Sequence, residues 1–364
     1  MMRMSEVRGR AWRLLAGRHG RHDGGARSLS GGTGRWVRGR EVAPRPPGVV
    51  MAFPVVLWRK KEINRLHAGV TLAEKREGRS DMGKEQELAR GESQREGIRH
   101  GWERAAPSYR EGFGRALAEI SHALANMLPS PPPEPVLDLA CGPGTAMAAV
   151  DRHHGPVLAV GCDFSHAMAG FARKVIGTGH GVVADQDRLP FAPETFGTVV
   201  SSMGTIFSKD PEAQLSGISL ILKNGGHFAF SAWGEPHETA LGEVSRRIVG
   251  LWPYPMSQTM PPLETPYSRG RSPWLDQAAR KAHLDVRSVT SHWLVFRFAD
   301  RMEAARSLAG TGRLALLTGG DPKKERELFD IAMEAFRPHE DPRTGRVELS
   351  NRYHLFHLVR TFFP

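Results

Sequence analysis

A turn containing two glycines follows the first buried strand that the sequence predicts. The stretch VLDLACGPGTAMAAV covers residues 136–150, in which a short apolar run is followed by Gly142, Gly144 and helix-forming residues. Glycines let a ligand approach the backbone, and the start of the next helix offers free N–H groups and the positive end of its dipole. The turn therefore predicts a site for a nucleotide-like ligand.

The spacing within this turn argues against two of the ligand classes that use such a device. A phosphate-binding P-loop requires Gly-x4-Gly-Lys-Ser/Thr, and no lysine follows Gly144. A dinucleotide fingerprint requires a third glycine for close packing of the helix on the strand, but Met147 occupies that position. Asp138 within the strand is also unusual for that fingerprint. Neither class therefore fits the turn in full.

A resemblance to a known family accounts for the whole pattern. The string DLACGPG at 138–144 resembles the first motif of class I S-adenosylmethionine-dependent methyltransferases, in the ubiquinone/menaquinone-biosynthesis-like (methyltransferase type 11) branch, with Ala140 replacing the usual first glycine. Later motifs of the family are resembled in the same order by CDFSHAM at 162–168, ADQDRLPF at 184–191, FGTVV at 196–200 and LKNGGHF at 222–228. Gly197 departs from the usual Asp. The segment Trp102-x3-Ala-x2-Tyr109 resembles the entry helix of that branch.

The resemblance implies S-adenosylmethionine as the cofactor and a role for each matching residue. Asp163 would accept hydrogen bonds from both ribose hydroxyls, with helix N-capping as the alternative. Asp185 would face the adenine amine, with a solvated turn carboxylate as the alternative. Tyr109 would close over the methionine end, with helix packing as an equal alternative. The implied cofactor-binding residues are Tyr109, Asp138, Ala140, Cys141, Gly142, Gly144, Asp163, Phe164, Asp185, Gln186, Ser202 and Met203.

Within this set the backbone of residues 140–144 would line the methionine end and the ribose. Asp138 would orient that loop and help to hold the ligand's ammonium group. Gln186 would lie beside the adenine, and Ser202 and Met203 would approach the sulfonium and the methyl acceptor.

No compulsory catalytic residue follows from the sequence. Methyl transfer is an in-line displacement at an activated electrophile, so positioning can supply much of the rate, and a base is needed only for a protonated acceptor. His227, His237 and His292 are candidate bases, although structural histidines are the favoured interpretation. The pairs His153-His154 and His354-x-x-His357 lack convincing metal partners, so we expect no metal.

Short apolar strands alternate with helices from residue 136 onward, which predicts a parallel sheet covered on both faces. We expect an α/β, doubly wound, Rossmann-like sheet of seven strands, mostly parallel with the last strand antiparallel, and an inserted acceptor-binding lid. The predicted segments are a helical region and Pro-rich connector at 82–135, a cofactor-binding core at 136–233, a lid at 234–275 and the completion of the sheet at 276–364. Within them we expect a helix over about 84–128, a third strand at 182–185, a turn at 224–226 before the fifth strand, and two helices between the last two strands. The first of these helices has an apolar stripe formed by Phe113, Leu117, Ile120, Leu124 and Met127.

The net charge of +11 is concentrated near the start of the chain. Residues 1–80 contain 18 Lys+Arg and 6 Asp+Glu, which leaves 32 and 33 of the totals of 50 and 39 for the remainder, a net of −1. Residues 1–81 are expected to be a disordered basic tract, with a nucleic-acid-binding arm, an organelle-targeting presequence, or a translation start at Met51 or Met82 as alternatives; we favour the late start.

The remaining composition predicts a soluble, cytoplasmic protein without a membrane span. Two cysteines are too few for a disulfide framework, and no apolar run is long enough to cross a bilayer. The leading hypothesis is methyl transfer to a small, apolar or aromatic organic acceptor. Alternatives are a non-catalytic cofactor-binding partner protein and an RNA-modifying methyltransferase, although SSMG at 201–204 replaces the Asn/Asp-Pro-Pro-Tyr of base-amine enzymes. The oligomeric state is not predicted.

Overall fold

The computed structural model describes residues 81–176, 180–255, 267 and 274–362, and the structural statements below concern these residues. The expectations for the tract before residue 81, and for Met256 and Met260 in the predicted lid, lie outside them. In the part of the chain that is described, no helix is both long and apolar enough to cross a bilayer.

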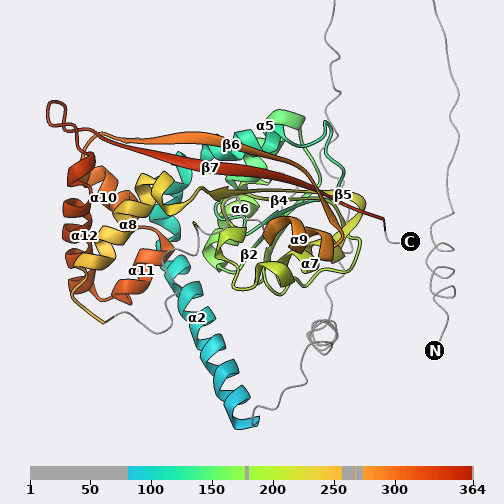
Figure 1. Cartoon of the computed structure of the whole chain (residues 1–364), viewed down its shortest axis with the longest axis horizontal. Helices are drawn as coiled ribbons and strands as arrows, with labels where there is room; N and C mark the ends of the chain where they lie inside the picture. The colour runs from blue at the N-terminus through green and yellow to red at the C-terminus, as the bar shows by residue number, and fades with distance from the viewer. Residues whose placement is uncertain (1–80, 177–179, 256–266, 268–273, 363–364) are drawn as a thin grey trace, which may run out of the picture. The chain divides into compact units, whose positions relative to one another are not determined.

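A seven-stranded sheet with the order β3-β2-β1-β4-β5-β7-β6 forms the centre of the fold (Figure 1). Five strands run parallel: β1 (Val136–Leu139), β2 (Ala159–Asp163), β3 (His180–Val183), β4 (Phe196–Ser201) and β5 (Leu222–Trp233). The last strand, β7 (Val347–Arg360), lies antiparallel between β5 and β6 (Leu284–Phe298). The predicted α/β sheet with an antiparallel last strand is confirmed.

The strand order reverses direction between β1 and β4. From β1 the chain passes through α5 (Thr145–His154) to β2 and through α6 (His166–Val175) to β3, whereas α7 (Pro211–Ile221) carries it the other way, from β4 to β5. Right-handed crossovers that step in opposite directions place their helices on opposite faces of a sheet. Ligands bind at the carboxyl ends of the strands where such a reversal occurs.

The N-terminal helical region consists of three helices, where the sequence predicted one over 84–128. These are α2 (Asp81–Glu111), α3 (Phe113–Ala116) and α4 (Ala118–Asn126). Gly112 breaks the helix because its φ of −102° and ψ of −99° are not helical. Four members of the predicted apolar stripe are nevertheless buried, with Phe113, Leu117, Ile120 and Leu124 all at most 6% exposed, and the fifth, Met127, is partly buried against the core.

The segment between β6 and β7 contains three α-helices, where the sequence predicted two. They are α10 (Arg301–Ala309), α11 (Gly312–Thr318) and α12 (Pro322–Ala335). Glycines at 310 and 319 end the first two, and the Asp321 carboxylate caps the third by accepting from the Lys323 and Lys324 amides. These helices gather with α8 (Ala240–Leu251) at one end of the sheet, whereas α9 (Trp274–Lys281) lies near α7 (Figure 1).

Two glycine features near β4 and β5 differ from the sequence expectation. The predicted Asn224-Gly-Gly226 turn is an irregularity within β5, where the register against β4 shifts between Phe196 and Thr198. Gly197 stands where the family usually has Asp because the Pro-rich connector crosses it: a Cβ there would lie 2.6 Å from the Pro133 carbonyl carbon. A side chain at 197 is therefore excluded sterically.

Candidate functional site

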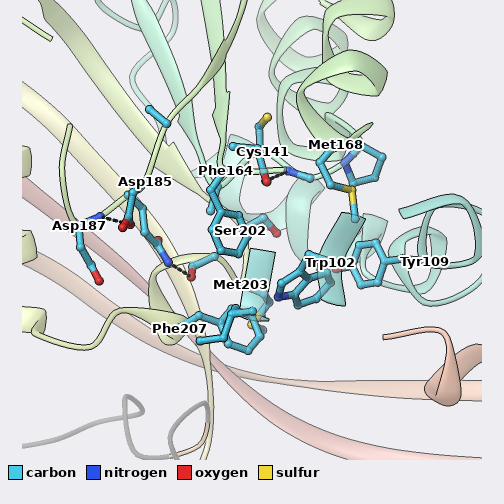
Figure 2. A pocket seen from close by; sticks show the side chains of 18 of the residues that line it. Trp102, Tyr109, Cys141, Phe164, Met168, Asp185, Asp187, Ser202, Met203 and Phe207 are labelled. Carbon is cyan, nitrogen blue, oxygen red and sulfur yellow. Dashed lines mark hydrogen bonds between the residues drawn. The ribbon is translucent and has the colours of Figure 1, made fainter. Parts of the chain in front are cut away.

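A pocket, called the first pocket below, opens at the carboxyl ends of β1, β2 and β4, where the strand order reverses. It brings together ten of the twelve residues that the sequence assigned to the cofactor (Figure 2). These are Tyr109, Ala140, Cys141, Gly142, Asp163, Phe164, Asp185, Gln186, Ser202 and Met203. Gly144 and Asp138 do not line it.

The turn after β1 forms the floor of the first pocket through an unusual backbone conformation. Ala140, Gly142 and Gly144 all have positive φ, at 52°, 52° and 91°. No atom lies within 4 Å of a Cβ built on Gly142, so its backbone faces open space. A Cβ on Gly144 would lie 3.1 Å from the Ala172 Cα, so this glycine instead permits close packing of the turn on α6.

Asp163 joins the turn after β1 to the start of α6. One carboxylate oxygen accepts a hydrogen bond from the Gly142 amide and the other from the Ser165 amide, both at 2.9 Å. The residue is only 7% exposed, and burial raises its pKa to about 6 against these stabilising bonds. The N-cap of α6 is Ser165, whose hydroxyl accepts from the Met168 amide, so the N-cap alternative for Asp163 is wrong.

Asp138 lies on β1 beneath the turn and is 1% exposed. Among the described residues, no hydrogen-bond donor reaches either carboxyl oxygen within bonding geometry. Burial raises its pKa well above the ordinary value, and the facing Met147 amide offsets this only in part. The expectation that Asp138 orients the loop and helps to hold the ammonium stays a prediction, and from its place beneath the turn it would act through the loop.

Asp185 and Gln186 lie in the loop after β3, which ends at Val183, two residues earlier than the sequence predicted. The Asp185 carboxylate accepts from the Asp187 amide at 2.9 Å and pairs with the Arg95 Nε at 3.4 Å. The Gln186 side chain donates to the Gly204 carbonyl at 3.3 Å and thereby links this loop to the one after β4. Asp185 thus lines the pocket, and its carboxylate also contacts α2 through Arg95.

The loops after β1 and β4 contact one another. Met203 has a φ of 56°, and its amide donates to the Ser231 hydroxyl at 2.9 Å. A Cβ on Gly204 would lie 2.6 Å from the Ala140 Cβ. The methyl group of Ala140, which replaces a glycine of the family motif, therefore requires a glycine opposite it.

Helix α2 crosses the first pocket, and three of the residues that it contributes were not assigned to the cofactor from the sequence: Arg95, Ile98 and Trp102. Arg95, Ile98, Trp102 and Tyr109 line the pocket from this helix. Their spacings of 3, 4 and 7 residues are typical of one helix face, so the sequence pattern could have indicated Arg95 and Ile98. Burial raises the pKa of the Tyr109 phenol, so the hydroxyl stays protonated and can donate a hydrogen bond.

Three aromatic rings stand between the first pocket and a second one. Trp102 makes edge contacts with Tyr109 at 5.3 Å and with Phe207 at 5.6 Å between ring centroids (Figure 2). Phe207 lies in the 3₁₀ helix η1 (Thr205–Phe207) after β4, and no sequence pattern marked it. Trp102 in turn contacts α11, where a Cβ on Gly312 would lie 2.2 Å from the indole.

The second pocket adjoins the first and is mostly apolar. The two have empty volumes of about 980 and 630 Å³, solvent at their mouths included. Both are lined by Trp102, Tyr109, Leu117, Met203 and Phe207. The second is completed by Phe113, Ile206, Trp233, Leu241, Ser245, Tyr267, Leu308, Thr311 and Leu314. Within the described part of the chain, none of its lining residues is Asp, Glu, Lys, Arg or His.

The predicted lid contributes to the second pocket in part. Leu241 and Ser245 of α8 and Tyr267, which belong to this segment, line it, and its role as an acceptor-binding lid stays a prediction. Trp252 and Tyr254, which were also expected near the acceptor, line neither pocket. They contact one another at 5.3 Å, and the Lys324 ammonium of α12 lies 4.9 Å from the Tyr254 ring centroid. These two aromatics therefore fasten α8 to α12.

The candidate histidine bases lie outside both pockets. His227 and His357 share a hydrogen bond at 2.9 Å between β5 and β7, and His292 stacks on Tyr353 at 5.3 Å. His237 is part of η2 (Pro236–Glu238). Among the described residues, no group of three or more His, Cys, Asp or Glu side chains is arranged to hold a metal ion.

Comparison with known proteins gives consistent matches. Residues 136–226 match the model of a methyltransferase domain. The chain is 32% identical to a malonyl-[acyl-carrier protein] O-methyltransferase of Herminiimonas arsenicoxydans over 39% of this chain and 55% of that protein. It is 36% identical to a demethylmenaquinone methyltransferase of Corynebacterium glutamicum over 32% of this chain and 50% of that protein.

The chain thus spans about half the length of the curated relatives it matches. Among solved structures, a chain of the Haloferax volcanii complex with the methyltransferase activator Trm112 matches at 22% identity and a TM-score of 0.47, over 73% of this chain and 99% of that one.

Proposed function

We propose that this chain, which carries a class I S-adenosylmethionine-dependent methyltransferase domain of the ubiquinone/menaquinone-like branch, transfers a methyl group from S-adenosylmethionine to a small apolar or aromatic acceptor. The observation that carries the proposal is that the two pockets adjoin. The first is lined by ten of the residues that the resemblance assigns to the cofactor, the lining of the second is mostly apolar, and five residues line both.

The residues of the first pocket fit the functional groups of this cofactor. The Asp163 carboxylate uses one backbone donor on each oxygen, which leaves acceptor capacity on both for a pair of ribose hydroxyls. Asp185 offers a carboxylate to an exocyclic amine, beside the aromatic Phe164. The exposed backbone at Gly142 allows the ligand to approach the turn.

Catalysis in this arrangement would rest on positioning. When bound, the cofactor supplies a methyl group that is already activated on a sulfonium. The chain then has to hold the acceptor in line with that methyl group at near-attack distance, which can account for a large share of the rate. Met203, Trp102 and Phe207 lie where the two pockets meet, and we assign to them the alignment of the acceptor.

The lining of the second pocket favours an uncharged acceptor. A carboxylate such as a malonyl group would lose its hydration there without gaining a cationic partner from the described lining residues. Aromatic and aliphatic walls instead stabilise a quinone-like or other apolar ring through burial of apolar surface. Of the activities named for the two relatives, the pocket therefore fits methylation of an apolar ring better than methylation of a malonyl group.

The proposal is tested in two steps with the purified full-length chain. Calorimetry should show stoichiometric binding of S-adenosylmethionine but not of NAD. Transfer of a labelled methyl group from the cofactor should then be assayed over fractionated metabolite extracts, and we expect label in an organic-phase, uncharged product. Binding without any methylated product across such pools would favour a non-catalytic cofactor-binding protein, and label in RNA would favour an RNA-modifying enzyme.

A further inference from the structure

Glu103 makes a contact between α2 and α6 that the cofactor residues do not explain. One carboxylate oxygen accepts from the Ser165 hydroxyl at 2.6 Å, and the other accepts from the Ala167 amide at 3.0 Å. Ser165 and Ala167 lie at the start of α6, 62 and 64 residues further along the chain. Glu103 therefore binds free N-terminal groups of a helix to which it does not belong.

The start of α6 does not need this carboxylate for an ordinary cap. The Ser165 hydroxyl already accepts from the Met168 amide at 3.2 Å. The additional bonds from Glu103 instead fix α2 against α6 immediately beside Trp102, which lines both pockets. At the other end of the pocket, the Arg95–Asp185 pair makes a second link from α2.

Glu103 also brings a second carboxylate close to Asp163. Both groups bond to Ser165, Glu103 to its hydroxyl and Asp163 to its amide. Burial is the main cause of the raised pKa of Asp163, and repulsion from Glu103 adds to it. The other titratable groups that interact with Asp163 are Tyr109 of α2, Asp138 of β1, Cys141 of the following turn and Cys162 of β2.

We propose that Glu103 is a positioning residue of the cofactor site, whose carboxylate holds α2 across the first pocket by bonding to the start of α6 and places a negative charge beside Asp163. The inference rests on the proposed function, because it assigns Asp163 to the cofactor ribose. Removing the bonds should loosen α2 and weaken binding at every pH. Removing only the charge should make the Asp163 carboxylate easier to form, so that binding persists to lower pH.

The experiment measures binding of S-adenosylmethionine by calorimetry between pH 5 and pH 8 for the full chain and three variants. Glu103→Ala removes both bonds and the charge. Glu103→Gln removes the charge and keeps one acceptor oxygen, so it can retain the bond from Ser165 but loses the one from the Ala167 amide. Glu111→Gln is the matched control, because this residue ends the same helix with its side chain 73% exposed and pairs only with the neighbouring Arg110 in the described contacts.

We expect Glu103→Ala to bind about tenfold more weakly at pH 8, the size of a typical coupling between linked sites. Glu103→Gln should lose less at pH 8, and its loss of affinity on acidification should begin at a lower pH than in the unaltered chain. Glu111→Gln should match the unaltered chain throughout. The charge role would be overturned if Glu103→Gln melted like the unaltered chain and its affinity for S-adenosylmethionine fell at the same pH as that of the unaltered chain. The positioning role would be overturned if Glu103→Ala bound S-adenosylmethionine with unchanged affinity.

These outcomes differ from a failure of the proposed function. If the unaltered chain does not bind S-adenosylmethionine, both proposals fail together. If it binds and transfers methyl groups while the Glu103 variants bind as it does, only the inference about Glu103 fails.

Discussion

The two pockets share a wall but are built in opposite ways. The first is built mainly on short turns at strand ends and is crossed by α2, and three carboxylates, those of Asp163, Asp185 and Asp187, are among its lining groups. The second is formed by apolar side chains from helices and loops that lie far apart in the sequence, from Phe113 to Leu314. A cofactor with a constant structure is matched by local backbone geometry, whereas an acceptor that differs among enzymes is matched by packing of separate segments.

This contrast implies that substitutions should affect the two ligands separately except at the shared wall. Strand-end residues should govern affinity for the cofactor, and the inserted helices should govern the acceptor.

The largest difference between the effects on the two ligands should come from Asp163→Ala, which should weaken binding of the cofactor. Losing hydrogen bonds to a charged acceptor costs about 1–3 kcal/mol, so affinity for S-adenosylmethionine should fall by about 5- to 150-fold. Calorimetry at pH 8 measures this directly, and Asp163→Asn, which keeps the volume, serves as the companion variant. Affinity within about twofold of the unaltered chain in both variants would contradict the assignment of Asp163 to the ribose.

Filling the second pocket should lower kcat/KM for the acceptor and leave the affinity for the cofactor unchanged. Ser245→Phe replaces a small residue that lines the second pocket with a large ring, and we expect kcat/KM for the acceptor to fall by about tenfold or more, equal to at least about 1.4 kcal/mol. Steady-state kinetics gives this value, and calorimetry should show unchanged cofactor binding. Ser245→Ala, which removes only a bond to the Leu241 carbonyl, is the control. An equal loss of cofactor affinity would mean that the pockets are not separable.

Acidification should weaken the affinity of the chain for the cofactor. The pKa of Asp163 is raised to about 6, and ribose hydroxyls bind to its carboxylate form. Protonation therefore competes with binding: affinity should be constant above about pH 7 and fall as the pH drops through 6, by about tenfold between pH 7 and pH 5. Titrations across this range check the sign, and affinity that rises on acidification would be incompatible with a ribose-binding carboxylate.

The smallest effect is expected for Ala140→Gly in the turn after β1. Glycine removes a left-handed strain of about 1–2 kcal/mol but loses more backbone entropy on folding, so the free energy of unfolding should change by less than about 1 kcal/mol. Ala146→Gly in the following helix has no strain to relieve and should lose about 1 kcal/mol. Urea unfolding compares the two, and equal losses would show that the turn is unstrained.

The sequence predicted the parts of the molecule that depend on local patterns. The alternation of strands and helices after residue 136 indicated the doubly wound sheet, which is confirmed. The motif order indicated a methyltransferase domain, which the match over residues 136–226 confirms, and with it S-adenosylmethionine as the cofactor. The roles of the individual cofactor residues stay predictions, although the fold brings ten of them to one pocket.

The second pocket could not be predicted because its walls depend on packing between distant segments. Leu308, Thr311 and Leu314 look like ordinary helix residues in the sequence, and only the placement of α10 and α11 beside α2 brings them to Trp102. Phe207 likewise follows β4 without a motif. Glu103 bonds across 62 residues to Ser165, a separation that no short pattern covers.

Gly312 touches the wall between the pockets without lining either one. Any side chain larger than hydrogen at this position would displace the Trp102 indole, which a Cβ would approach to 2.2 Å. A programme of directed evolution toward new acceptors could therefore start at residue 312: small substitutions there would move the indole and reshape the space next to the methyl group, while every strand-end residue of the cofactor pocket kept its chemical identity.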